Sequence, residues 1–139
     1  MQRIFPATFA RRSSTKRSPS TKPHDVIRLG HIRDAAQQAL EFAEGRSREV
    51  LEHDPMLEYA LTRCLEIIGE AATRLSRESL ESMPEIPWRE VIGMRNRLIH
   101  AYASVDRNFL WETVRSDIPP LLDKVILALA EGGSGPLPK

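Results

Sequence analysis

Apolar residues recur every three or four positions along most of the chain, a spacing that predicts α-helices. The apolar stripes occupy four segments, which are residues 26–43, 57–75, 91–99 and 109–129. No segment alternates apolar and polar residues for long enough to indicate a strand, and no internal repeat is visible. The pattern therefore predicts an all-α fold, a four- to five-helix up-and-down bundle.

Capping residues mark the expected ends of the first two helices. Asp25 is expected to cap the N-terminus of the first helix, and Gly45 to end it, because glycine readily adopts the left-handed conformation found after helices. The short charged segment 46–53 has room for a helical turn of its own. Asp54 and Pro55 then combine a capping side chain with a proline at the first helical position, which predicts the start of the second helix.

Prolines interrupt the second half of the pattern. The second helix is expected to run to about Leu80 and to stop before segment 83–87, because each of its two prolines disfavours helix at the preceding residue. A third helix should start near Trp88. Asp106 is expected to cap a fourth helix, which the pair Pro119-Pro120 should kink.

Length and charge indicate one folded domain with unstructured ends. A chain of 139 residues buries a single core, expected over residues 25–131, and residues 132–139 form a flexible, glycine-rich tail. Residues 1–24 are expected to be a disordered basic N-terminal extension, because residues 1–23 carry 6 basic residues, no acidic residue and no hydrophobic period. A misassigned start codon, a targeting peptide and a nucleic-acid-binding arm are alternative interpretations.

Composition narrows the possible partners of the domain. Beyond residue 23 the chain has 14 of its 20 basic residues against 19 acidic ones, so RNA or DNA would be attracted by a local patch or by the extension. No apolar run approaches the about 20 residues of a membrane span, so no membrane partner is expected. Cys64, the single cysteine, excludes an internal disulfide and fits a reducing cytoplasm; its place on an apolar stripe favours a core position.

Metal and cofactor signals are missing from the sequence. His24, His31 and His53 are scattered, with no carboxylate or cysteine at the spacing that metal ligands need. The chain also has no glycine-rich phosphate loop. We therefore expect neither a metal nor another cofactor.

One octapeptide, residues 95–102, concentrates side chains that a helical scaffold does not need. Arg95 is a fixed cation, His100 titrates near neutral pH, and Tyr102 carries a phenol. On a regular helix, residues five apart differ by about 140°, so Arg95 and His100 would face different sides. They can act together if the helix ends before His100, or if two copies of the chain pool them across a two-fold axis. The plainer interpretation is an exposed arginine and a histidine favoured by the helix dipole.

Two further polar residues, Glu70 and Arg97, are candidates for contact with this group of side chains. Gly69 lets a neighbouring backbone approach the second helix closely, which would allow Glu70 to orient Arg95 or His100; a solvated glutamate is the alternative. Arg97 falls on a different face from Arg95 and is expected to be an ordinary surface or salt-bridge residue.

The octapeptide also resembles a known signature. Arg95-x4-His100-x-Tyr102 is similar to the R-x4-H-x-Y signature of HepT-type toxins in the HEPN superfamily, and Asn96 matches the polar residue that often follows the arginine there. The resemblance covers about residues 25–130, and the basic extension departs from it. Further stretches that match in order and spacing are His31–Ala35, Glu66–Ala71, Ile86–Trp88, and Trp111 with Asp117–Pro119.

The resemblance implies a metal-independent endoribonuclease that works as a homodimer and is the toxin of a type VII-like toxin–antitoxin pair in the cytoplasm. Arg95 and His100 would be catalytic at the dimer interface, cutting a tRNA or mRNA to leave a 2′,3′-cyclic phosphate. Asn96 and Glu70 are the expected supporting residues. The partner would be an MntA-type nucleotidyltransferase antitoxin that adds AMP to Tyr102.

A second function class remains open at this point. The HEPN fold is also used without catalysis, and an acidic domain is an unpromising surface for RNA. The alternative is therefore a non-catalytic helical binding module that docks a nucleotidyltransferase or a nucleotide.

Overall fold

The computed structural model describes residues 22–98 and 105–132, and these residues form helices joined by short turns, with no β-sheet. The elements are α1 (Pro23–Ala43), the 3₁₀ helix η2 (Arg48–Glu52), α2 (Pro55–Thr73), α3 (Arg77–Ser82), α4 (Trp88–Ile92), α5 (Met94–Leu98), α6 (Arg107–Glu112), the π-helical segment η3 (Thr113–Asp117) and α7 (Ile118–Gly132).

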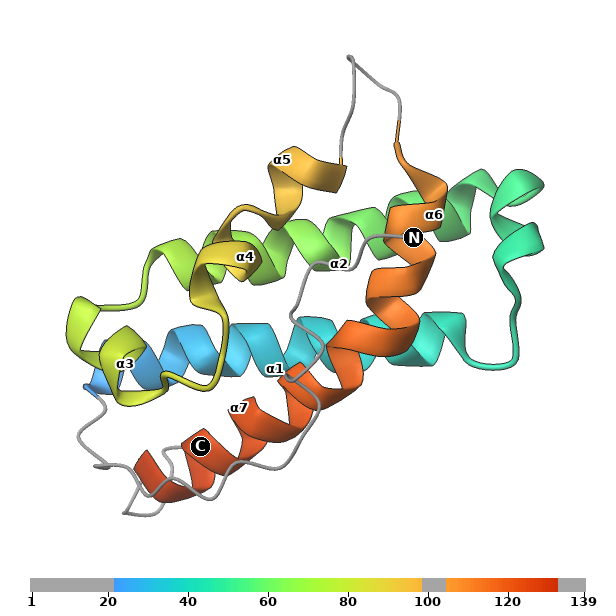
Figure 1. Cartoon of the computed structure of the whole chain (residues 1–139). Coiled ribbons are helices and arrows are strands. Elements are labelled where there is room, and N and C mark those ends of the chain that lie inside the picture. The colour runs from blue at the N-terminus through green and yellow to red at the C-terminus, as the bar shows by residue number, and fades with distance from the viewer. Residues whose placement is uncertain (1–21, 99–104, 133–139) are drawn as a thin grey trace.

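The long helices α1 and α2 lie side by side and run in opposite directions (Figure 1). Of the continuous run α6, η3 and α7, the last two pack against α1, whereas α6 contacts η2 and α2; the short helices α4 and α5 pack against α2. The direction of the chain alternates from one layer to the next, as Figure 1 shows. The predicted all-α, up-and-down bundle is confirmed.

A single apolar core joins these layers. It draws on α1, α2 and the four helices that pack against them, in agreement with the predicted stripes. Cys64 is buried in it, as predicted, and burial raises the pKa of its thiol, so the residue is part of the packing and a poor nucleophile. The largest fully buried side chains include Leu29, Ile32, Leu61, Leu65, Ile68, Met94, Leu98, Leu110, Ile118 and Leu121.

The first helix begins three residues earlier than predicted, with Lys22 at the N-cap position, and the expected role of Asp25 was wrong. Pro23 occupies the first turn of α1, where its missing N–H costs nothing, and Asp25 lies inside the helix, fully buried. Its carboxylate accepts hydrogen bonds from the Ser76 N–H (2.9 Å), the Ser76 Oγ (2.6 Å) and the Ser79 Oγ (2.8 Å). Asp25 therefore fastens the start of α3 instead of capping α1.

The second helix ends at Thr73, seven residues before the predicted Leu80. Ser76 explains the break, because its Oγ accepts the Ser79 N–H (3.1 Å) and starts the separate helix α3. The other predicted caps are confirmed. Gly45 has a φ of +74°, and Asp54 accepts the Leu57 N–H at 3.1 Å.

The third and fourth predicted helices are each divided. Gly93 separates α4 from α5, where one helix was expected. Asp106 caps α6 as predicted, by accepting the Phe109 N–H at 3.0 Å. The chain then passes through η3 immediately before Pro119-Pro120, two residues that cannot donate a hydrogen bond to the preceding turn.

Several sequence-based expectations lie outside the described residues. These concern residues 1–21 of the basic extension, residues 133–139 of the tail, His100 and Tyr102. Among the helices that the structure describes, none is both long and apolar enough to cross a membrane.

Candidate functional site

The helix that carries Arg95 is positioned by a close approach between two backbones. A Cβ atom added to Gly69 of α2 would lie only 3.3 Å from the carbonyl oxygen of Val91 in α4. The expected role of Gly69 is therefore confirmed. Because Gly69 has no side chain, the backbone of α4 packs directly on α2. This contact determines how close the following helix, α5, lies to α2.

Burial of two residues decides which side of α5 faces outward. Met94 and Leu98 are four positions apart, so they share a face of the helix, and both are fully buried against the core. Arg95 and Asn96 consequently lie on the exposed side. The helix thus presents a guanidinium and an amide to solvent from a fixed support.

A carboxylate of α2 lies beside the Arg95 side chain. The Oε2 atom of Glu66 lies 3.8 Å from Nε of Arg95, and its Oε1 atom lies 3.6 Å from Nη1 of Arg63. The Glu66 side chain is only 23% exposed, whereas that of Arg95 is 63% exposed. Glu66 can therefore orient Arg95 while leaving most of its guanidinium open to an anionic ligand.

In the structure Glu70 corresponds to the alternative interpretation, an exposed glutamate on the surface of α2. Glu70 pairs with Arg74, one helical turn along α2, with 3.2 Å between Oε2 and Nη2. Glu66, which sequence reasoning missed, takes the place beside Arg95. Both glutamates occur in the same stretch of sequence and share a helix face, so only the position at which α5 crosses α2 distinguishes them. The expected contact of Glu70 with His100 lies outside the described residues.

The ends of the segment that carries His100 and Tyr102 are held together. The Asp106 N–H donates a hydrogen bond to the Leu98 carbonyl at 3.0 Å. The guanidinium of Arg97 lies over the ring of Phe109, 4.7 Å from its centroid. Arg97 was expected to be an ordinary surface or salt-bridge residue; it instead joins α5 to α6. Arg95 and the two ends of segment 99–104 therefore belong to one framework.

A second contact ties α6 to α2. Arg107, the first residue of α6, donates a hydrogen bond from Nε to Oε1 of Glu58 at 2.6 Å, and the Glu58 side chain is almost buried. The Nη1 atom of Arg107 also lies 3.5 Å from Oε1 of Glu52 in η2. This ion-pair cluster fixes the chain immediately after the segment that carries the predicted catalytic histidine.

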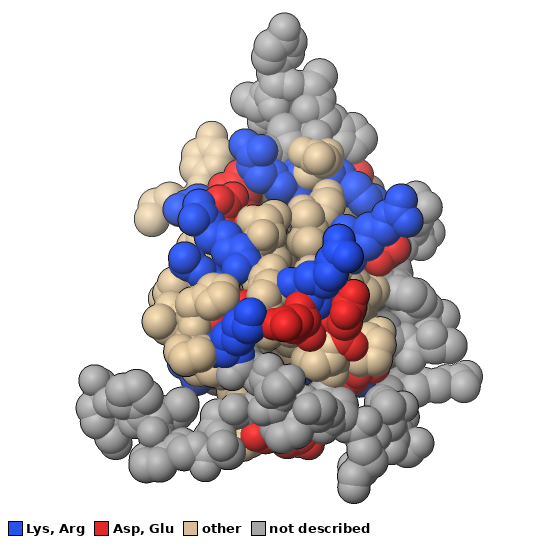
Figure 2. Space-filling view, turned by 90° about the vertical axis from the view of Figure 1, so that its left-hand side faces the viewer, with Lys and Arg blue, Asp and Glu red and all other residues tan. Residues whose placement is uncertain are grey.

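The charged side chains of the described residues are mixed, and no three of them form a metal site. Figure 2 shows that Lys and Arg gather on the end of the bundle that carries α3 and the start of α1, with acidic residues between them. No group of three or more His, Cys, Asp or Glu side chains within residues 22–98 and 105–132 is placed to hold a metal ion.

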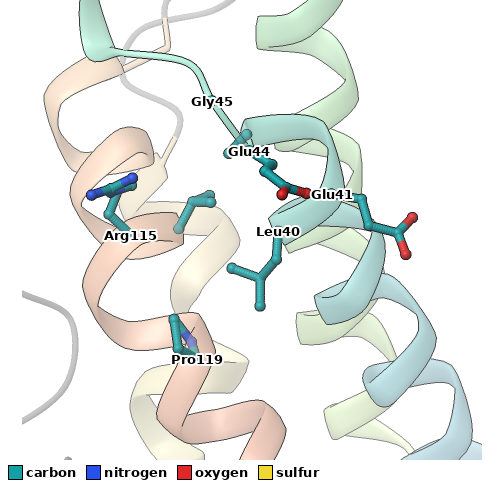
Figure 3. A pocket seen from close by; sticks show the side chains of 8 residues that line it. Leu40, Glu41, Glu44, Gly45, Arg115 and Pro119 are labelled. Atoms are coloured by element: carbon teal, nitrogen blue, oxygen red, sulfur yellow. The ribbon is translucent and has the colours of Figure 1, made fainter.

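A cavity of about 370 Å³ lies away from Arg95, between the end of α1 and the η3–α7 junction. Figure 3 shows its two walls, with Leu40, Glu41 and Glu44 on one side and Arg115 and Pro119 on the other. Two carboxylates and one guanidinium make it unsuitable for a polyanion. The site around Arg95 remains the better candidate for phosphate chemistry.

Comparison with known proteins places the chain in a family. Residues 32–127 match the family model described as "Ribonuclease HepT-like". A protein of Thermococcus cleftensis named "Probable ribonuclease HepT" is 43% identical over 98 residues, covering 68% of this chain and 88% of its own length. A protein of Caldanaerobacter subterraneus subsp. tengcongensis named "Putative RNase" is 41% identical over 97 residues, covering 70% and 87%.

A third relative, from Methanocaldococcus jannaschii and also named "Putative RNase", is 36% identical over 97 residues, covering 70% of this chain and 89% of its own length. No solved structure matches the chain. The family match spans α1 to α7, including Arg95, Glu66 and the segment between α5 and α6. The resemblance first recognised in the octapeptide is thereby confirmed, and the chain belongs to the HepT-like ribonuclease family.

Proposed function

We propose that the chain is a metal-independent endoribonuclease, the toxin of a toxin–antitoxin pair, and that Arg95 and His100 are its catalytic residues. The observation that carries the proposal is the placement of Arg95. It is an exposed cation on a rigid support, oriented by Glu66, in a chain of the HepT-like ribonuclease family. His100 follows Leu98, the last residue of α5, by two positions in the sequence and Arg95 by five.

The proposed chemistry uses the 2′-hydroxyl of the RNA as its nucleophile. The neutral imidazole of His100 takes the 2′-OH proton, and the 2′-oxygen attacks the adjacent phosphorus. The bond from phosphorus to the 5′-oxygen breaks, and an imidazolium returns a proton to that leaving oxygen. Arg95 stabilises the negative charge that develops on the non-bridging phosphate oxygens, and Asn96 adds an amide donor beside it. The products are a 2′,3′-cyclic phosphate and a 5′-hydroxyl.

Cleavage by this route should be independent of divalent metal. We expect the purified chain to cut single-stranded RNA at an unchanged rate in excess EDTA, since the cation at the phosphate is a guanidinium. Mass spectrometry of the fragments should find 2′,3′-cyclic phosphate ends. A requirement for Mg²⁺, or fragments ending in 5′-phosphate, would contradict the proposed mechanism.

We further propose that the chain acts as a homodimer with the Arg95–His100 sites at the interface. Two copies related by a two-fold axis bring two identical motifs together, which overcomes the angular offset of residues five apart on a helix. Light scattering should then give about twice the chain mass of 15.8 kDa.

Tyr102 is the proposed point of control. We propose that a nucleotidyltransferase antitoxin of the MntA type, with ATP and Mg²⁺, transfers AMP to the Tyr102 hydroxyl and releases pyrophosphate. The adduct adds a bulky anion two residues from His100, which competes with the RNA phosphate for Arg95. Tyr102→Phe should therefore remain toxic to cells that also produce the antitoxin. Neutralisation of Tyr102→Phe as complete as that of the wild type would show that the antitoxin acts by occlusion alone.

A non-catalytic binding module is the second candidate. The excess of 19 acidic over 14 basic residues beyond residue 23 favours it, because this charge repels RNA over long distances. In that case the exposed Arg95 binds a nucleotide or the nucleotidyltransferase, and the pure chain cuts no RNA. The absence of cleavage, together with tight binding of the antitoxin, would identify this second function.

A further inference from the structure

A second cluster of cations lies beside Arg95, in a groove between α1 and α2. We call it the α1–α2 groove. Its volume is about 190 Å³. Two residues of α1 and five of α2 form it, namely Arg28, His31, Arg63, Ile67, Glu70, Ala71 and Arg74.

The spacing of these residues makes the groove a feature of the helix pair. Positions three and four apart lie on the same side of a helix, and the charged α2 members Arg63, Glu70 and Arg74 are seven and four residues apart, about two turns and one turn of the helix. The two α1 members are three apart. Arg28 and His31 therefore form the α1 wall of the groove, and Arg63 and Arg74 belong to its α2 wall.

The arginines of the groove are only partly satisfied by partners within the described residues. Nε of Arg28 is buried and has no hydrogen-bond partner among the described residues. The pair between Arg74 and Glu70 is exposed on both sides, and an exposed pair of this kind contributes only about 0–1 kcal/mol, so an incoming anion can displace it. The groove thus offers the weakly paired guanidinium of Arg74 beside an arginine, Arg28, whose buried Nε has no partner of its own in the part of the chain that the structure describes.

Glu66 connects this groove to the candidate catalytic arginine. One of its carboxylate oxygens faces Arg63, which lines the groove, and the other faces Arg95. The cations of the groove and the catalytic arginine therefore meet at one side chain. A ligand bound in the groove would lie directly beside a phosphate held by Arg95.

We propose that the α1–α2 groove binds the sugar-phosphate backbone of the RNA strand next to the bond that is cut. This inference rests on the proposed ribonuclease function. A row of guanidiniums fits the regularly spaced phosphates of a single strand, each of which can accept a forked pair of hydrogen bonds. The groove contains no aromatic ring for stacking bases, so it positions the strand without reading its sequence.

The groove also explains how RNA could bind to a domain that carries an excess of acidic residues. A molecule with an excess of negative charge attracts RNA only through a local patch of cations. The groove provides three arginines and a histidine against one glutamate within a single small volume. Because the groove lies beside Arg95, contacts with the sugar-phosphate backbone in the groove would position the scissile phosphate at Arg95.

The test compares two double variants in a chain made unable to cleave by His100→Ala. Arg28→Gln with Arg74→Gln removes two groove cations, and Arg46→Gln with Arg115→Gln removes two exposed cations outside it. The groove variant should weaken the binding of single-stranded RNA by about tenfold. For the groove variant, the slope of log K against log salt concentration should be smaller in magnitude by about 1.4, because each lost phosphate contact in a single strand removes about 0.7 from that slope. The control should bind like the His100→Ala parent.

Arg74→Gln alone, an exposed substitution that leaves the core untouched, should reduce the salt dependence by about half as much. Equal RNA binding by the groove variant and the control would overturn the proposal. So would a groove variant that keeps its RNA affinity and loses affinity for the antitoxin, which would assign the groove to the protein partner. Because binding is measured without cleavage, the two failures are distinguishable: equal RNA binding by the groove variant and the control refutes the groove alone, whereas no cleavage by the wild-type chain refutes the ribonuclease function on which the groove proposal rests.

Discussion

Arg95→Ala should lower the rate of RNA cleavage by about 10²- to 10³-fold, because it removes the charge that stabilises the phosphate in the transition state. His100→Ala should lower the rate by about 10²- to 10⁴-fold through loss of the acid–base group. Initial rates with a labelled oligonucleotide would measure both effects. Arg89→Ala, an exposed change on the preceding helix, is the matched control and should cut at the wild-type rate. Wild-type activity in Arg95→Ala would remove Arg95 from the mechanism.

Arg95→Lys separates charge from shape at the same position. It keeps the cation, but it loses the planar fork that binds two phosphate oxygens, so we expect activity between wild type and Arg95→Ala.

A mixed dimer of Arg95→Ala and His100→Ala chains tests whether the Arg95 and His100 of one site come from the same chain. Recovered activity would mean that one site combines residues of both chains, and a dead mixture would mean that each site belongs to one chain.

Asp25→Ala should lower the free energy of unfolding by about 3–5 kcal/mol, since it leaves three donors from Ser76 and Ser79 around an empty buried position. Urea unfolding at pH 7 measures the change. Asp34→Ala, on the same helix but exposed, should stay within about 0.5 kcal/mol of wild type. A similar small effect for Asp25→Ala would show that the buried carboxylate adds little to the attachment of α3.

The contribution of Asp25 should also depend on pH. Burial by itself raises the pKa of this carboxyl, but the hydrogen bonds from Ser76 and Ser79 outweigh burial and lower the pKa below its ordinary value. A lowered pKa in the folded state means that the stabilisation is complete above the unfolded pKa of about 3.9 and is lost as pH falls through the folded value. The difference in stability between wild type and Asp25→Ala should therefore narrow in acid.

The spacing of apolar residues was sufficient to predict the bundle, because burial of one helix face dominates the energy of an all-α domain. It was insufficient where a single polar residue has a distant partner. Asp25 has the composition of an N-cap, but its partners lie more than 50 residues away on α3. The end of α2 at Thr73 was missed for the same reason, since Ser76 begins a helix that is fastened by that carboxylate.

The candidate site was predictable in part. The sequence singled out Gly69 as a point of close approach, which the structure confirms, and Arg95 as a functional cation, which stays a prediction. The position of Glu66 beside Arg95 was not predicted, because the crossing of α5 over α2 depends on tertiary packing, which local spacing does not specify. The stacking of Arg97 on Phe109 was likewise invisible, because those residues belong to different helices.

The most direct test of the proposed function is whether cleavage requires the 2′-hydroxyl of the RNA. Two oligonucleotides would be compared with the purified wild-type chain: an all-RNA strand, and the same strand with a single 2′-deoxy nucleotide immediately before the cut bond. The mechanism predicts that the first is cut at that bond and the second is not, because no nucleophile remains there. Equal cutting of both strands, or no cutting of either, would contradict an Arg95–His100 ribonuclease.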